Sequence, residues 1–172
     1  MEPIILIRPA KLGDAETVLN IHKSVIAEGL YLTPASEEFT RTVEEQRDSL
    51  KNLLASDREI MFVAEAAGEV VGWVVFYAHE RKRMAHTGYM GIVIQDGYRN
   101  LGIGKLLVKE LLDWAEQNPM IEKVSLAVFS TNHQAISLYK SMGFIEEGRK
   151  IKEYMMDETT YVDDVLMYRL VN

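Results

Sequence analysis

The chain of 172 residues contains no cysteine. This absence excludes disulfide bonds, zinc sites built from thiolates and any mechanism that passes through an acyl-cysteine. No apolar run approaches the length of about 18 residues that a membrane-spanning helix needs, so no contact with a membrane is expected. The first residues, Met1-Glu2-Pro3-Ile4, carry no basic segment typical of a secretory signal. We therefore expect a cytoplasmic protein.

Basic residues are too few to balance the acidic ones, and the formal net charge is −7. A nucleic-acid partner is not expected, because such a partner requires a basic face. The negative charge either steers cationic small molecules toward the protein or serves only to keep it in solution. Hydrophobic residues make up 48% of the chain and charged residues 26%, a balance that predicts a folded core. The length fits one domain, residues 1–172.

Hydrophobic periodicity and turn residues predict a mixture of strands and helices. Strands are expected at 4–8, 60–65, 70–79, 87–94, 124–129, from 144 onward and at 161–170. Helices are expected to begin at Asp14, after the turn at 34–36, at the glycine turn near 102 and at Asn132. The middle of the chain then forms a right-handed crossover between two parallel strands. The fold class is α/β (α+β), with a mixed, mostly antiparallel sheet of about seven strands and about four helices.

Several positions carry more detailed expectations. The side chain of Asp14 is expected to cap the first helix. Gly88 and Gly91 interrupt a predicted strand, which indicates a bulge or a close approach by other atoms. The second helix should bury a stripe formed by Phe39, Val43, Leu50, Leu53 and Leu54. The third helix should bury Ile103, Leu106, Leu107, Leu111, Leu112 and Ala115.

The most informative segment is Arg99-Asn100-Leu101-Gly102-Ile103-Gly104-Lys105, which follows a predicted strand and opens a helix. The first N–H groups of a helix have no partner within the helix, and glycines leave them uncovered. Together with the helix dipole, such a turn forms an anion-binding site. The segment therefore predicts a ligand that carries phosphate, with additional positive charge from Arg99 and Lys105.

Two common phosphate-binding motifs do not fit this turn. A Walker A loop would need glycine at position 99 and serine or threonine at 106, where the chain has Arg99 and Leu106. A dinucleotide-binding fingerprint beginning at Gly102 would need glycine or alanine at position 107, where the chain has Leu107.

The Arg-x-x-Gly-x-Gly pattern of this turn instead resembles the acetyl-CoA-binding turn of the GNAT superfamily of N-acetyltransferases. A second segment, residues 132–144 (NHQAISLYKSMGF), resembles that family's Asn-x-x-Ala-x-x-x-Tyr-x-x-x-Gly-Phe pattern. The resemblance covers nearly the whole chain and implies acetyl-CoA as co-substrate. It places the pyrophosphate on the glycine turn and the pantetheine chain beside the strand that ends at Ile94. The implied coenzyme-binding residues are Ile92, Val93, Ile94, Arg99, Asn100, Leu101, Gly102, Ile103, Gly104, Lys105, Asn132 and Tyr139.

The resemblance also implies direct transfer of the acetyl group to an amine, with Tyr139 as the general acid that protonates the leaving thiolate. Tyr139 lies seven residues after Asn132, so both side chains share one helix face, about 10 Å apart. The strand at 87–94 contains no acidic residue that could act as the general base. Glu28 and His86 are the candidates for that role. No spacing of histidines and carboxylates predicts a metal site.

We therefore expect an acetyl-CoA-dependent N-acetyltransferase that modifies the primary amine of a small molecule, such as an amino acid, a polyamine or an amine antibiotic. Two alternatives remain: an acetyltransferase of protein or peptide amines, and a CoA-binding sensor without activity. A homodimer is also possible, because the exposed final strands of the chain are free to pair.

Overall fold

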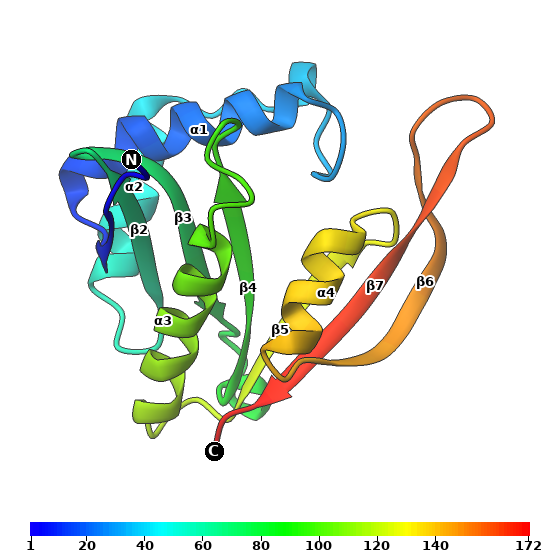
Figure 1. The fold of residues 1–172 in the computed structure, drawn as a ribbon. Helices are drawn as coiled ribbons and strands as arrows, with labels where there is room; N and C mark the ends of the chain where they lie inside the picture. The colour runs from blue at the N-terminus through cyan, green and yellow to red at the C-terminus, as the bar shows by residue number, and fades with distance from the viewer.

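The computed structural model describes residues 1–172 and contains one seven-stranded sheet with four α-helices (Figure 1). The strands are β1 (Ile5–Pro9), β2 (Ile60–Ala66), β3 (Glu69–Ala78), β4 (Thr87–Ile94), β5 (Lys123–Phe129), β6 (Ile145–Met155) and β7 (Tyr161–Leu170). The helices are α1 (Ala15–Ala27), α2 (Val43–Leu54), α3 (Ile103–Gln117) and α4 (His133–Ser141). Short 3₁₀ turns occupy Leu12–Asp14, Ser36–Glu38 and Lys82–Met84.

The order of strands in the sheet is β1-β2-β3-β4-β5-β7-β6, and every neighbouring pair is antiparallel except β4 and β5. The parallel pair is short: it joins Thr87–Tyr89 to Lys123–Ser125 and then ends. Beyond this point the two strands diverge, and Figure 1 shows the β1–β4 part of the sheet separated from the β5–β7 part. The predicted mixed sheet with a central parallel crossover is confirmed.

The helices cover both faces of the sheet. One core cluster joins residues of α1 and α2 to Met61, Val63, Trp73, Val75 and Val93 on one face. A larger cluster joins the buried side of α3, together with Tyr139 of α4, to the opposite face. Side chains alternate between the two faces along each strand, so Gly91 and Val93 of β4 face α1 while Met90 and Ile92 face α3.

Some expected helix positions differ from the structure. Leu106 is 42% exposed, and Val108 takes its expected place in the core under α3. Phe39 precedes α2 and stacks against His22, while Leu54 lies at the exposed end of α2. The buried residues of α3 still follow helical periodicity, but the covered face includes Val108 and leaves Leu106 outside it.

The two glycines of β4 have different roles. A side chain at Gly88 would collide with the backbone carbonyl of Tyr77 and with the Phe76 ring, so this glycine permits a close approach of β3 and β4. The expected bulge at Gly91 is absent, because the pairing of β3 with β4 runs through this residue without a register shift. Gly91 instead lies where β4 has separated from β5.

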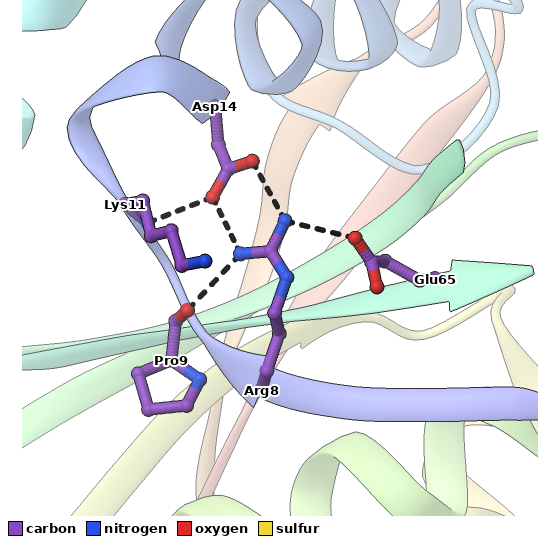
Figure 2. Close-up of polar contacts among 5 residues, drawn as sticks. All are labelled: Arg8, Pro9, Lys11, Asp14 and Glu65. Carbon is purple, nitrogen blue, oxygen red and sulfur yellow. Dashed lines mark hydrogen bonds and ion pairs between the residues drawn. The ribbon is translucent and has the colours of Figure 1, made fainter. Parts of the chain in front are cut away.

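The first strand is tied to the first helix by a guanidinium–carboxylate network (Figure 2). Arg8 donates two hydrogen bonds to Asp14, of 2.8 and 2.9 Å, and a third of 3.1 Å to Glu65 on the neighbouring strand. Asp14 occupies the N-cap position of α1, as predicted, but its side chain accepts from the backbone N–H of Lys11 and not from α1. The hydrogen bond from Arg8 lowers the pKa of the Asp14 carboxyl.

This network predicts a stability change that depends on pH. A carboxyl whose pKa is lowered in the folded state stabilises the fold above its unfolded pKa, near 4, and loses that contribution as the pH falls through the lowered value. Asp14→Asn should reduce the free energy of unfolding by about 1–3 kcal/mol at pH 7. In urea titrations this difference should shrink below about pH 4, where Asp14 of the unfolded chain becomes protonated, and vanish once the pH falls below the lowered pKa of the folded protein. Asp48→Asn, at an exposed position, serves as the control. A stability difference between wild type and Asp14→Asn that does not depend on pH would contradict the stabilising role of the Asp14 carboxylate.

Candidate active site

A cavity of about 400 Å³ lies where β4 and β5 diverge. It is bounded by the glycine turn, by the two diverging strands, by α4 and by the chain that follows α1. All the predicted coenzyme-binding residues except Leu101 line it, and so does Glu28. Ligands of sheets with parallel strands bind at the carboxyl ends of those strands, and this cavity lies at such an end.

The glycine turn presents uncovered backbone to the cavity. Gly102 has a φ of +80° in the left-handed region, and nothing lies within 4 Å of the position that a Cβ would occupy there. The first backbone bond at the start of α3 runs from Leu106 N–H to the Gly102 carbonyl, at 3.2 Å. The N–H groups of Ile103, Gly104 and Lys105 precede it and have no partner within the helix. This turn therefore fits a diphosphate, held by backbone N–H groups and the helix dipole.

Two residues of the turn are placed differently from the expectation. The Leu101 side chain is exposed outside the cavity. The Arg99 guanidinium is already hydrogen-bonded to other groups. Its Nε and Nη2 donate to the carbonyl of Ile94, at 3.0 and 2.9 Å. The same guanidinium donates to both carboxylate oxygens of Glu28. Of the two basic residues predicted to favour phosphate, Lys105 is the one without an ion pair to an acidic side chain.

The pairing with Arg99 does not suit Glu28 for the role of general base. The two hydrogen bonds measure 2.5 and 2.7 Å, and they lower the pKa of the Glu28 carboxyl. A carboxylate with a lowered pKa is a weaker proton acceptor at the pH of the reaction. His86 fits no better, because it is exposed just before Thr87, at the end of β4 remote from the cavity.

Helix α4 places its two predicted site residues on the cavity. Asn132 accepts a hydrogen bond from the N–H of Ala135 at 3.3 Å, which confirms that it caps this helix. Gln134 donates to the side chain of Asn100, and this contact fastens the start of α4 to the glycine turn. Tyr139, one to two turns further on, is only 6% exposed and packs edge-on against Phe144.

The hydroxyl of Tyr139 is held in its protonated form by its surroundings. Burial raises the pKa of this phenol, and no neighbouring charge or hydrogen bond opposes the effect. A protonated hydroxyl at the wall of the cavity can act as a proton donor, since a general acid must hold its proton until the reaction needs it.

The strand edge beside the gap is the remaining predicted part of the site. Ile92, Val93 and Ile94 pair with β3 on one side, while on the other side β4 has no partner after Tyr89. An unpaired strand edge offers main-chain donors and acceptors to an extended ligand with amide groups. The turn and the edge together fit a ligand that carries a diphosphate at one end of an amide chain.

Sequence reasoning missed the part of the cavity wall that the end of α1 and the following segment supply. Val25, Leu30 and Leu32 line the cavity from the end of α1 and the segment after it, together with Tyr31. Gly29, with a φ of +66°, turns the chain at this point. The glycine correctly predicted the end of α1, but no pattern in the sequence indicated that the residues after it would cross to the cavity.

These features define an acyltransferase site built around a coenzyme with a diphosphate and a pantetheine chain. The model of the Acetyltransferase (GNAT) family matches residues 28–144, more than half of the chain. The chain therefore belongs to the GNAT family, and it is an acetyl-CoA-dependent N-acetyltransferase.

Characterised relatives match along most of their length. The L-amino acid N-acetyltransferase AaaT of Escherichia coli (strain K12) is 28% identical over 168 residues, 96% of this chain and 98% of that protein. An N-alpha-acetyltransferase of Sulfurisphaera tokodaii is 29% identical over 159 residues, 88% of this chain and 86% of that protein.

Solved structures share the fold. An acetyltransferase of the GNAT family from Streptococcus pneumoniae has a TM-score of 0.92 at 31% identity, covering 97% of this chain and 99% of that chain. The yncA protein of Salmonella typhimurium, whose structure contains its cofactor acetyl-CoA, has a TM-score of 0.88 at 16% identity, covering 98% and 95%. Because only 16% of the residues are identical, this comparison shows that the two chains share a fold and nothing more.

No group of three or more histidine and carboxylate side chains in the chain is arranged to hold a metal ion. None of the helices combines the length and the apolar character needed to cross a membrane.

The glycine turn can be tested with a matched pair of substitutions. Gly102 and Gly97 both have a positive φ, of +80° and +87°, and both have open space around them, but only Gly102 lines the cavity. Both valine variants therefore carry similar backbone strain. Gly102→Val should raise the dissociation constant of coenzyme A at least about tenfold in calorimetry, because its side chain obstructs the N–H groups of a helix start. Gly97→Val should change it less than about twofold, and equal effects of the two substitutions would contradict this assignment.

Proposed function

We propose that the protein transfers the acetyl group of acetyl-CoA directly to the primary amino group of a small molecule, an amino acid above all. The observation that carries this proposal is the cavity beside the glycine turn, whose lining includes Val25, Leu30, Tyr31 and Leu32. A cavity suits a small acceptor better than a polypeptide, which needs an open groove. The extensive match to an L-amino acid N-acetyltransferase supports the same acceptor class.

The residues of the turn and of α4 hold the coenzyme in this proposal. The N–H groups at the start of α3 bind the pyrophosphate, with Lys105 adding positive charge. The free edge of β4 at Ile92–Ile94 and the side chain of Asn132 bind the pantetheine amides. The sheet takes its strands from both ends of the chain, which supports treating residues 1–172 as one acetyltransferase domain.

The chemistry then requires a proton donor near the sulfur. Acetyl-CoA, when bound, supplies a thioester that a neutral amine can attack, with the coenzyme leaving as a thiolate. Tyr139 holds its proton because burial raises its pKa, and it lines the cavity from α4. We assign it the donation of that proton to the leaving sulfur, and the proton that the attacking nitrogen loses as the amide forms restores the Tyr139 hydroxyl. The chain has no cysteine, so no acyl-cysteine forms on the way.

Removal of the Tyr139 hydroxyl tests this assignment. Tyr139→Phe preserves the packing of the ring against Phe144 but removes the proton donor, so kcat should fall about a hundredfold or more. The dissociation constant of acetyl-CoA should stay within about twofold. Tyr168→Phe removes a hydroxyl outside the cavity and serves as the control. A Tyr139→Phe enzyme with the kcat of wild type at every pH would exclude this role.

A comparison of acceptors tests the proposed function. Release of the coenzyme A thiol should be measured with free amino acids, simple primary amines and peptides that present a free N-terminus. The proposal predicts that kcat/KM for the best free amino acid or amine exceeds that for the peptides at least about tenfold. A preference for the peptides would instead assign the protein to the acetylation of protein N-termini, the activity named for its relative from Sulfurisphaera tokodaii.

A further inference from the structure

We propose that the side chain of the acceptor lies against the ring of Tyr89, and that the protein thereby favours free amino acids with an aromatic side chain. This inference rests on the proposed function and names the substrate class within it. In this proposal Tyr89 determines specificity and takes no part in proton transfer.

The reacting end of the coenzyme is located by the free edge of β4. The glycine turn that fits the diphosphate follows this strand, so a ligand that continues along the free edge runs from Ile94 back toward Met90. The free edge ends at Tyr89, the last residue of β4 that pairs with β5. The acyl end of such a ligand therefore lies near Met90 and Gly91, where the two strands begin to separate.

The acceptor reaches this point from the face of the sheet that α1 covers. Helices α3 and α4 occupy the opposite face, and Tyr139 packs there. The cavity extends through the gap, because its lining also includes Gly91, Val93 and Ala127. These three positions alternate along their strands with core residues packed on α3, so they belong to the α1 face.

The α1 face has free space at Gly91. A Cβ at this residue would meet a single neighbouring atom within 4 Å, a methyl carbon of Val75 at 3.8 Å. Across the gap, Ala127 follows Ser125 by two residues, as Gly91 follows Tyr89, and Ser125 pairs with Tyr89. Two small residues therefore face each other across the gap, and an amino group can approach the acyl carbon between them.

Tyr89 is the next residue of β4 on this face, and it lies directly beside the free space. Its ring lies 5.6 Å from the ring of Tyr77, the residue opposite it on β3, and 5.8 Å from the imidazole of His79. Tyr89 nevertheless remains 49% exposed, so the core does not use the whole ring. A substituent that extends from the amine toward the start of β4 meets this ring.

The surroundings of the free space suit an aromatic substituent. The side chains of the strands around it on this face are uncharged, and they belong to Val75, Tyr77, Tyr89, Ser125, Ala127 and Leu166. An aromatic ring gains from tilted or offset contact with tyrosine rings in addition to the burial of its apolar surface. A cationic side chain would lose hydration without finding a carboxylate there.

The charged residues of β4, β5 and β7 on this face are Lys123 and Asp164, and both are already engaged. Lys123 forms an ion pair with Glu147 at 3.2 Å, and its Nζ lies 5.1 Å from the centre of the Tyr168 ring. Asp164 is only 4% exposed, and burial raises the pKa of its carboxyl. Neither residue offers an accessible counter-ion to a charged acceptor side chain.

The test compares L-phenylalanine with L-cyclohexylalanine, which share the carbon skeleton and the α-carboxylate and differ in aromaticity. With acetyl-CoA and the full chain, kcat/KM of wild type should be about two- to tenfold higher for L-phenylalanine. Tyr89→Leu removes the ring and should abolish this preference. Tyr89→Phe keeps the ring and should retain it. L-Arginine, measured beside them, represents a cationic side chain and should be the poorest of the three.

A control variant separates specificity from damage to the fold. Tyr161→Leu removes a ring of similar exposure, 45%, at the start of β7 and outside the cavity. It should leave the ratio of the two kcat/KM values as it is in wild type. Circular dichroism checks folding, and calorimetry checks that the dissociation constant of coenzyme A stays within about twofold in each variant.

The outcomes are distinct. A preference for L-phenylalanine that is lost in Tyr89→Leu and kept in Tyr89→Phe supports the proposal. Equal use of both amino acids by wild type, an unchanged ratio in Tyr89→Leu or a preference for L-arginine overturns it, while the acetylation of free amino acids leaves the proposed function intact. Equal loss of kcat toward both amino acids in Tyr89→Phe would give the hydroxyl a part in the chemistry and also overturn the proposal. Activity with peptides and with no free amino acid would overturn the proposed function together with this inference.

Discussion

The site depends on the early separation of β4 from β5. The two strands pair over only three residues each and then diverge, so the sheet opens at its centre. The pairing of β4 with β3 continues without interruption, and β5 remains paired with β7, so each half of the sheet stays intact around the opening. The unpaired edge of β4 becomes available to a ligand without exposing the hydrophobic core.

The residues that face this opening belong to helices and turns that begin or end beside it. The left-handed Gly102 lets α3 start at the end of the gap, and the Asn132 cap starts α4 across from it. The contact between Gln134 and Asn100 joins the two helix starts. Since helix starts carry unpaired N–H groups, their convergence concentrates anion-binding capacity where the coenzyme enters.

Two of the three charged side chains that line the cavity compensate each other, and Lys105 has no ion pair to an acidic side chain. Glu28 and Arg99 neutralise each other at the rim, while Tyr139 stays protonated because burial disfavours its anion. Apolar side chains from the end of α1 and the segment after it line the cavity as well. Polar and apolar parts of the cavity lining suit acetyl transfer, because the phosphates of the coenzyme require polar donors and the amine must reach the thioester in its neutral form.

Local patterns in the sequence were sufficient for the parts of this protein that short-range physics controls. The glycine turn, the Asn132 cap and the sequence of strands and helices follow from spacing, capping and hydrophobic periodicity within a few residues. The pattern at 99–105 and the segment at 132–144 also sufficed to indicate the family. The burial of Leu106 and Phe39 was less predictable, because the elements that cover a side chain come from elsewhere in the chain.

Only the tertiary structure decided how distant residues share the site. Glu28 and Arg99 are separated by 71 positions, and no local pattern shows that the expected base and the expected phosphate ligand bind each other. The same applies to Leu30 and Leu32, which line the cavity because Gly29 turns the chain toward β4. The sequence alone determined which anion-binding turn the chain can form. The packing of α1 against the opened sheet decided which residues line the cavity, because long-range contacts depend on the whole fold.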